Sequence, residues 1–252
     1  MHRKHRPLVG LGVLGILAIA LMGASAVAQG PCGDLPDEAQ LRGFLRNAAT
    51  GTGVDDALSP GTDAGGIFGG ARMWGAVVNR QGELCAFVTS TDDPTQVLPI
   101  GQAIAKAKAY TANSVSLDDF VLSTARMYTL VQPGHSLYGL NNSNPFNPDL
   151  LAAPGQGGTG VNRIAGGSIT FGGGVALYRD GRIVGGLGVS GDTSCADHEI
   201  AKRVRDLAQL NPAGGALVDD IIYTDVDGPN IFAHPMCPNT KRNGAPLGDE
   251  RP

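Results

Sequence analysis

The sequence predicts an α+β domain, in which an antiparallel sheet made of two hairpins packs with helices. The first observation is that apolar runs at 175–178 and 183–189 flank an Asp-Gly pair at 180–181, which is a strong hairpin signal. The second is that apolar residues at 74–78 and 83–89 flank Arg80-Gln81-Gly82 in the same way. Because hairpin strands pair antiparallel, we expect the helices between them to cover the sheet.

Residues 1–28 have the composition of a secretory signal peptide. A basic start at 2–6 precedes an apolar core at 8–22, and Ala26-Val27-Ala28 supplies the small-residue cleavage pattern. We expect this segment to be removed on export, with a retained N-terminal anchor as the alternative. Removal changes the formal net charge from −4 to −7, because three basic residues leave with it. An acidic mature chain argues against nucleic acid or an anionic membrane surface as a partner.

Helices are predicted on either side of the first hairpin. One begins at 35–38, where a proline and two acids precede an apolar stripe. A second, rich in alanine, spans about 99–113. Its inward-facing residues are predicted to be Ile100, Ile104 and Ala107. Ser116 and Asp119 have the spacing of a capping box, which predicts a third helix that ends near 131–133.

The remainder of the chain contains a long irregular segment at 132–167 and a last helix after the second hairpin. A loop of that length inside a compact domain is usually functional or mobile. Ser194 is expected to cap the last helix, with Asp197 completing a capping box. The apolar residues at 196, 200, 204 and 207 have helical spacing and are expected to form one buried face. We expect a short edge strand at 219–224. The predicted organisation is a domain at 29–210 with an insertion at 132–167, followed by a tail at 211–252.

The glycine-rich turn before the last helix suggests two enzymatic interpretations, and neither fits well. Residues 186–191 match G-x-G-x-x-G, but a dinucleotide site needs a parallel βαβ unit and an acidic residue about 20 positions later, where Asn211 stands. Ser190, Asp192 and His198 suggest a hydrolase, but the residues around Ser190 lack the spacing of a nucleophile elbow. Close packing of the glycines, with anion binding at the helix start, is the simpler interpretation.

The four cysteines admit two interpretations. Cys195 and His198 form C-x-x-H, and His234 and Cys237 form H-x-x-C, so the four residues could hold zinc tetrahedrally. In an exported protein, however, disulfides are the default for an even number of cysteines. A disulfide to the last helix would also tether the tail. The expected pairs are therefore Cys195 with Cys237 and Cys32 with Cys85.

Three motifs resemble those of the haem-degrading family, the GlcG/HbpS-like proteins. Residues 108–112 resemble the family's K-A-x-T-A helix motif, and residues 185–201 resemble its G-x-G-V-S-G … D-x-x-I-A ending. Asn79-Arg80-Gln81-Gly82 lies where the family has its first hairpin turn. The resemblance covers about residues 70–210. It implies a profilin-like sandwich, homo-oligomers, and binding of haem or a related tetrapyrrole.

The resemblance also indicates which residues would contact the cofactor. Haem iron needs an axial ligand, most often a histidine, and signal removal would leave only three histidines. We take His198 as the first candidate iron ligand because, of the three histidines, it alone lies in a matching motif. His135 and Tyr138, at the start of the long loop, are the second candidates. The other cofactor contacts that the motifs imply are Lys108, Thr111, Ser190 and Gly191.

Three functions follow from these observations. The preferred one is an exported protein that binds haem or another tetrapyrrole for sequestration, sensing or delivery. The second is a secreted enzyme that degrades haem or oxidises a small molecule. The third is an interaction module that is stapled by disulfides and binds no small ligand.

Overall fold

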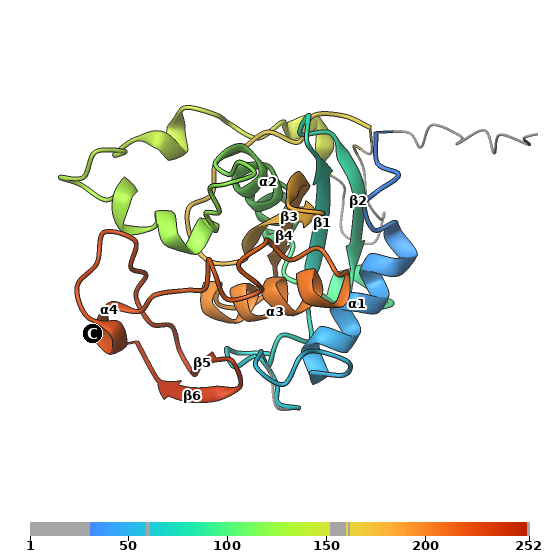
Figure 1. Ribbon diagram of the computed structural model, residues 1–252. Coiled ribbons are helices and arrows are strands. Elements are labelled where there is room, and N and C mark those ends of the chain that lie inside the picture. The colour runs from blue at the N-terminus through green and yellow to red at the C-terminus, as the bar shows by residue number, and fades with distance from the viewer. Residues whose placement is uncertain (1–30, 59–60, 152–159, 161, 251–252) are drawn as a thin grey trace, which may run out of the picture.

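A four-stranded antiparallel sheet forms the centre of the domain (Figure 1). The computed structural model describes residues 31–58, 61–151, 160 and 162–250, so the predicted signal peptide lies outside the described residues. The three strand pairings in this sheet are all antiparallel, which confirms the predicted α+β class and both hairpins. In the spatial order β2-β1-β4-β3, the strands are β2 (Leu84–Thr89), β1 (Trp74–Asn79), β4 (Arg182–Ser190) and β3 (Gly174–Arg179).

The second hairpin has the turn that its sequence predicts. Asp180 and Gly181 have φ angles of 51° and 76°, and a type I′ turn requires positive φ at both central residues. The two hairpins meet through β1 and β4, which pair from Trp74 opposite Ser190 to Asn79 opposite Gly185. The sheet is therefore continuous although its halves lie about a hundred residues apart in the chain.

Helices bury both faces of the sheet. On one face α2 (Gly101–Ser114) packs against Trp74, Ala76 and Val78 of β1. On the other face α1 (Glu38–Thr50) and α3 (Ser194–Leu207) lie side by side over Val77 (Figure 1). The alternation of side chains along β1 thus gives a helix–sheet–helix sandwich.

Glycines in β4 let α2 approach the sheet closely. A Cβ atom on Gly186 would overlap the carbonyl oxygen of Ala109, and one on Gly188 would overlap that of Ala105. The helix begins at Gly101, so Ile100 precedes it and is 71% exposed. The prediction that Ile100 faces inward is therefore wrong.

The N-caps of α1 and α3 differ in how well the sequence predicts them. At α1, Asp37 and Gln40 form a capping box, since each side chain accepts a hydrogen bond from the backbone amide of the other residue. At α3 the cap is Thr193, whose hydroxyl accepts the Ala196 amide at 3.3 Å. The predicted capping box of Ser194 and Asp197 is wrong, because Ser194 already lies inside the helix and the Asp197 carboxylate has other partners.

The predicted helix at 116–131 does not form. The Ser116 hydroxyl closes a turn by bonding the backbone of Leu122, and two short 3₁₀ turns follow at Thr124–Met127 and Thr129–Val131. Hydroxyl groups in this segment donate to distant carbonyl oxygens, Ser123 to that of Asp219 and Thr124 to that of Phe171. These tertiary hydrogen bonds compete with the helical ones and fix an irregular path.

Residues 211–250, which we call the C-terminal segment, pack over α3. The segment contains α4 (Thr224–Asp227) and a hairpin of β5 (Thr240–Arg242) and β6 (Ala245–Gly248). The edge strand predicted at 219–224 is wrong, since only an isolated bridge between Tyr223 and His234 forms there. Both expected disulfides are present, Cys195 with Cys237 and Cys32 with Cys85.

The C-terminal segment packs against charged residues of α3 that lie outside its predicted apolar face. The Lys202 ammonium lies 2.7 Å from Glu199 and 2.5 Å from Asp220, and Arg205 forms an ion pair with Asp219 at 2.6 Å. Ion pairing of this kind is what makes burial of such side chains tolerable. Both faces of α3 are therefore inside the protein.

Candidate functional site

The motif residues meet in a buried junction between α2, β4 and α3. The Lys108 ammonium lies 2.7 Å from one Asp197 carboxylate oxygen and donates to the Val189 carbonyl at 3.0 Å. The other carboxylate oxygen accepts the backbone amides of Gly191 and Asp192. Burial lowers the pKa of Lys108, and burial also raises the pKa of Asp197 to about 6 despite the ammonium beside it. The ion pair therefore joins three elements inside the core.

Thr111, Ser190 and Gly191 are buried around this junction. The Thr111 hydroxyl, one turn further along α2, donates to the Ala107 carbonyl and accepts the Ile169 amide. Ser190 is the last residue of β4 and pairs with the first residue of β1. Each of the three has contacts within the fold, and their contact with a cofactor stays a prediction.

His198 lies on α3 beneath the C-terminal segment and is fully buried. Among the described residues, neither ring nitrogen has a hydrogen-bond partner, and Nε2 is 3.7 Å from the Asp220 carboxylate. Burial, reinforced by the Lys202 ammonium, lowers the pKa of His198 to about 3, so the ring is neutral. The segment that covers the ring would have to move before an external ligand could reach it.

An open pocket of about 480 Å³ lies between residues 129–135 and residues 224–231, and we call it the His135 groove. Its lining residues are Thr129, His135, Thr224, Pro229, Asn230 and Ile231. The Thr129 hydroxyl donates to the Ala233 carbonyl at 2.7 Å, which ties the two walls together. Of the histidines in the described part of the chain, His135 alone is exposed. The groove therefore offers an imidazole that an external molecule can reach.

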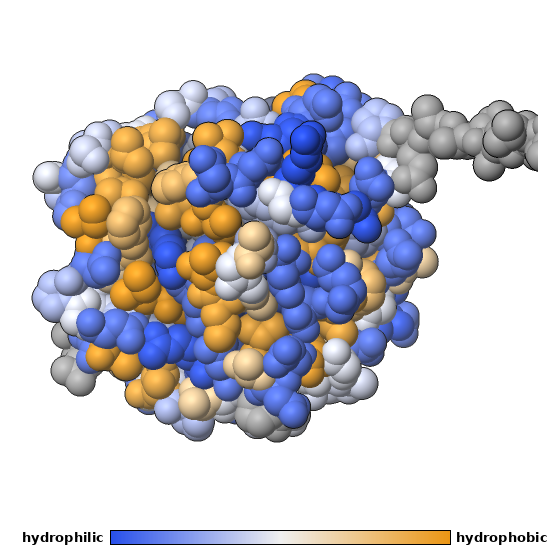
Figure 2. Space-filling model, in the orientation of Figure 1, coloured by the Kyte–Doolittle hydropathy of each residue, from blue (hydrophilic) through white to orange (hydrophobic). Residues whose placement is uncertain are grey.

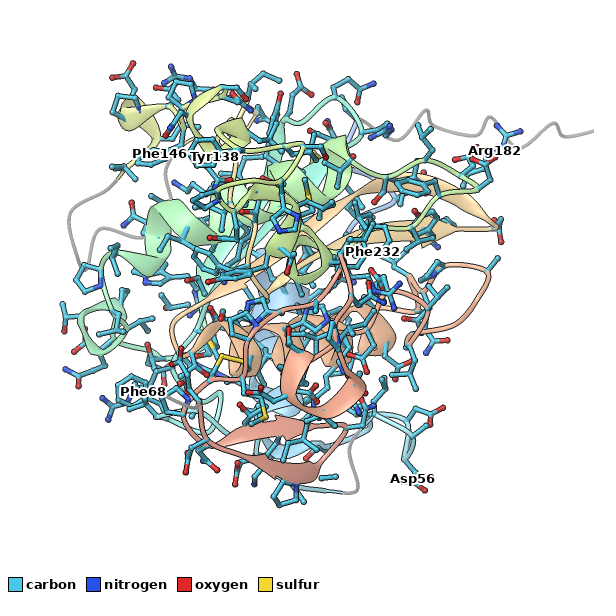
Figure 3. The ribbon with its side chains drawn as sticks, turned by 90° about the vertical axis from the view of Figure 1, so that its left-hand side faces the viewer. Asp56, Phe68, Tyr138, Phe146, Arg182 and Phe232 are labelled. Carbon is cyan, nitrogen blue, oxygen red and sulfur yellow. A yellow bond between two sulfur atoms is a disulfide. The ribbon has the colours of Figure 1, made fainter. Side chains whose placement is uncertain are left out.

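Exposed apolar side chains lie in and beside the His135 groove. Ile231, which lines the groove, is 56% exposed. Tyr138, Leu137 and Val226 do not line it, but they are exposed and lie near its lining residues in the chain. Figure 2 shows hydrophobic residues gathered on the left of the molecule, over these segments. Figure 3 views that side and labels Tyr138 on the irregular segment and Phe232 on the C-terminal segment. A concave site with exposed apolar side chains in and beside it is typical of ligand binding.

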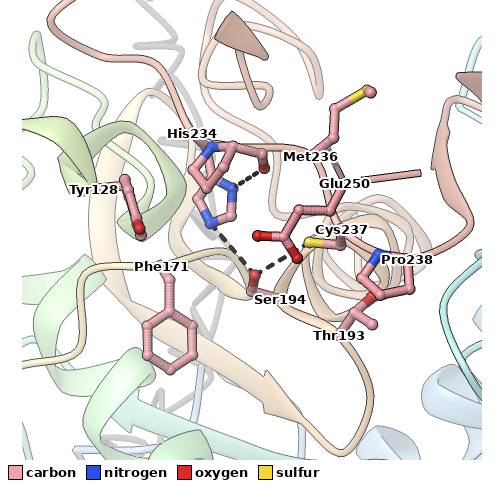
Figure 4. Close-up of a pocket in the computed structure, with 10 residues that line it drawn as sticks. Tyr128, Phe171, Thr193, Ser194, His234, Met236, Cys237, Pro238 and Glu250 are labelled. Carbon is pink, nitrogen blue, oxygen red and sulfur yellow. Dashed lines mark hydrogen bonds between the residues drawn. The ribbon is translucent and has the colours of Figure 1, made fainter. Parts of the chain in front are cut away.

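A second pocket, of about 370 Å³, opens at the start of α3, and we call it the His234 pocket (Figure 4). Tyr128 and Phe171 line one side, and Ser194, His234 and Cys237 line the other. The hydrogen bond of 2.6 Å between Nδ1 of His234 and the Pro235 carbonyl places the ring proton on Nδ1. Burial lowers the pKa of His234 to about 4, so Nε2 carries a lone pair.

The structure tests the four residues that suggested zinc. The ligand atoms of Cys195, His234 and Cys237 lie within 4.8 Å of one another, and His198 is not part of this group. The two cysteines are joined in the predicted disulfide. Tyr128 and Phe171, which complete the pocket, come from segments far apart in the chain, so no local sequence pattern could have found them.

The fold and its central junction define an α+β sandwich in which motif residues hold the sheet and helices together. A family model described as "Haem degrading protein HbpS-like" matches residues 67–206, which is more than half of the chain. The protein therefore belongs to the HbpS-like family of haem degrading proteins, which confirms the resemblance. Among the described residues, we find no helix with both the length and the hydrophobicity needed to cross a membrane.

The chain is also similar to part of a larger enzyme. It is 33% identical over 105 residues to the corrinoid adenosyltransferase PduO of Salmonella typhimurium and to that of Citrobacter freundii. The match covers 42% of this chain and 24% of each relative, so the chain spans about a quarter of their length.

Two solved structures are similar in part. The PduOC:heme complex has a TM-score of 0.44 and 25% identity, and the match covers 69% of this chain and 92% of that one. HbpS has a TM-score of 0.40 and 17% identity, with 66% of this chain and 84% of that one covered.

Proposed function

We propose that this protein is an exported haem-binding protein and that the His135 groove holds the haem. The observation that carries the proposal is the exposed imidazole of His135 in an open groove, lined in part by Pro229 and Ile231, of a haem-family member. Histidine is the most common axial ligand of haem iron. His198 and His234 are buried at 0% and 1% exposure, so His135 reaches an external ligand without rearrangement of the fold.

The residues of the groove fit a porphyrin in kind. Ile231 and Pro229 offer apolar surface to the ring, and Thr129, Thr224 and Asn230 offer polar groups near its edge. When bound, haem would supply a redox-active iron. In this proposal His135 would bind the iron, and Pro229 and Ile231 would contact the macrocycle.

Export is supported by chemistry as well as by the leader pattern. The two disulfides, Cys32–Cys85 and Cys195–Cys237, are typical of proteins in an oxidising compartment. An exported protein with a ligand groove on its surface suits sequestration or delivery of haem, and we propose binding rather than breakdown as its activity.

The test is a haem titration of the oxidised protein, followed by the Soret band. Wild type should show saturable binding. His135→Ala should shift the band and weaken binding at least about tenfold, since even loss of an outer-shell group at a metal site costs that much. Ile231→Glu should weaken binding but leave the band position unchanged, because it alters the groove wall and not the iron ligand.

Two variants serve as matched controls. His234→Ala and His198→Leu remove the other described histidines and should leave both affinity and band position unchanged. A wild-type protein without a saturable Soret shift would refute haem binding, and an unchanged His135→Ala variant would refute the ligand assignment. Loss of the band over time with a reductant would instead assign haem breakdown.

A further inference from the structure

We propose that the His234 pocket becomes a binding site for a thiophilic metal ion such as Zn²⁺ when the Cys195–Cys237 disulfide is reduced. The three potential ligand atoms, two Sγ and one imidazole nitrogen, already lie within 4.8 Å of one another, and all three residues are buried. Zn–S bonds of about 2.3 Å and Zn–N bonds of about 2.0 Å place tetrahedral ligands roughly 3.5–3.8 Å apart. Small movements after cleavage of the S–S bond would therefore complete the geometry.

The imidazole of His234 is held as metal-binding histidines usually are. Its Nδ1–H group donates to the Pro235 carbonyl at 2.6 Å, which fixes the tautomer and the ring orientation. Its Nε2 atom faces the disulfide side of the pocket, 3.4 Å from the Ser194 hydroxyl (Figure 4). The same hydroxyl lies 3.4 Å from Sγ of Cys237, so one small group bridges two of the proposed ligands.

The surroundings of the two sulfur atoms favour thiolates once the disulfide is open. Cys195 is the second residue of α3, so it lies in the first turn at the positive end of the helix dipole, which stabilises a negative charge. Its backbone amide lies 3.2 Å from Sγ of Cys237 and would donate to that thiolate. Glu250 also lines the pocket, and Figure 4 shows its carboxylate turned toward His234 and Cys237. A carboxylate oxygen or water could supply the fourth ligand.

The switch needs a reductant of the dithiol class. Two electrons and two protons from a dithiol convert the disulfide to two thiols, and the dithiol becomes a disulfide. Metal binding then displaces the two protons and leaves a dithiolate complex with the neutral imidazole. Oxidation would expel the metal and restore the S–S bond, so the redox state of the compartment would set the occupancy.

The second disulfide provides a matched control within the same chain. Cys32 and Cys85 join the N-terminal region to β2, and neither belongs to a group of potential metal ligands found among the described residues. A Cys32→Ser/Cys85→Ser variant keeps only the proposed site, and a Cys195→Ser/Cys237→Ser variant keeps only the control pair.

The experiment titrates haem-free protein with Co²⁺ and then Zn²⁺, so it stands whether or not the His135 groove binds haem. After reduction, wild type and the Cys32→Ser/Cys85→Ser variant should bind one Co²⁺ per chain, with thiolate charge-transfer bands that Zn²⁺ abolishes. Oxidised protein and the reduced Cys195→Ser/Cys237→Ser variant should show no such bands. His234→Ala should weaken binding at least about tenfold, because loss of even an outer-shell partner at a metal site costs that much.

A second measurement, protection of the cysteines from alkylation, tests the proposal even if reduction partly unfolds the protein. Zn²⁺ should slow alkylation of Cys195 and Cys237 in reduced wild type, as read by peptide mass spectrometry, and should leave Cys32 and Cys85 unprotected. The proposal fails if Zn²⁺ protects no cysteine, if it protects both pairs equally, or if His234→Ala binds Co²⁺ as tightly as wild type.

Discussion

The buried ring of His198 is an unusual feature at the scale of single residues. It lies on α3 beneath the C-terminal segment, and neither nitrogen has a hydrogen-bond partner among the described residues. Burial and the cations of Lys202 and Arg205 lower its pKa to about 3, against the opposing carboxylates of Asp219 and Asp220. A buried polar group without a hydrogen-bond partner destabilises a protein, so this ring lowers the free energy of unfolding.

We predict that His198→Leu makes the protein more resistant to acid. The unfolded chain takes up a proton near pH 6.5, but the folded chain does not until about pH 3, so His198 lowers stability as pH falls through that window. Relative to wild type, the variant should gain about 1.4 kcal/mol per pH unit below pH 6. Urea unfolding at pH 7.5, 6 and 5 measures this difference.

At pH 7.5 the variant should be at least as stable as wild type, because Leu removes a polar group that has no partner. Free energies of unfolding that change in parallel across the three pH values would contradict the assignment of a depressed pKa to this ring.

Helix α2 and strand β4 interact so closely that glycine is required between them. A Cβ atom on Gly188 would overlap the backbone of Ala105 and Ala109 in α2. Backbone cannot move aside as a flexible side chain can, so the helix would have to shift away from the sheet. The pairing of a glycine-rich strand with an alanine-rich helix is thus what sets the thickness of this layer.

We predict opposite effects for two glycine-to-alanine substitutions. Gly188→Ala should lower the free energy of unfolding by about 1–3 kcal/mol, as overpacking of a core does. Gly43→Ala should raise it by up to about 1 kcal/mol, because Gly43 lies within α1 and an added Cβ would meet no atom within 4 Å. Chemical denaturation of both variants gives the comparison, and a stable Gly188→Ala protein would show that α2 can retreat from the sheet.

At the scale of the whole molecule, the C-terminal segment turns a surface helix into an internal one. Its Asp219 and Asp220 pair with the cations of α3, and Cys237 joins it covalently to Cys195. The same segment forms a wall of the His135 groove and supplies His234 to the other pocket. This segment lies beyond residues 67–206, which match the family model, so both proposed sites depend in part on residues outside that match.

Export leads to a prediction about the N-terminus of the mature protein. Protein recovered from a secreting host should begin near Gln29, because Ala26-Val27-Ala28 has the pattern that signal peptidase cleaves. Intact-mass measurement checks this directly. A mass that still includes residues 1–28 would favour a retained anchor, and the proposal of a freely diffusing exported protein would then be withdrawn.

Much of the fold was predictable because it is encoded locally. The Asp180-Gly181 turn, the glycines of β4 and the alanines of α2 each specify a conformation through their own backbone preferences. The helix predicted at 116–131 was wrong because its hydroxyl groups bond carbonyls elsewhere in the fold, and no local pattern reveals such partners.

The candidate site was only partly predictable for the same reason. The sequence indicated His135 as one possible ligand of haem iron, because few histidines are available. It also predicted the Cys195–Cys237 disulfide, because only four cysteines are available to pair. It could not reveal that His198 is buried, since that depends on a covering segment that begins after residue 210.

The sequence by itself determined the two hairpins, α1, α2 and α3 and the family, because these follow from local periodicity, turn chemistry and motif spacing. The disulfide pairs were expected from the compartment, with zinc as the alternative, and the structure decided between the two. Only the tertiary structure decided which polar residues are buried and where pockets open. Burial and concavity arise where distant segments meet, as residues 128–135 do with residues 224–237. The charged residues of α3 have the pattern of a solvated surface, but they are buried. The C-terminal segment supplies partners for Lys202 and Arg205, and the carbonyls of Ala48 and Thr62 accept hydrogen bonds from Arg203.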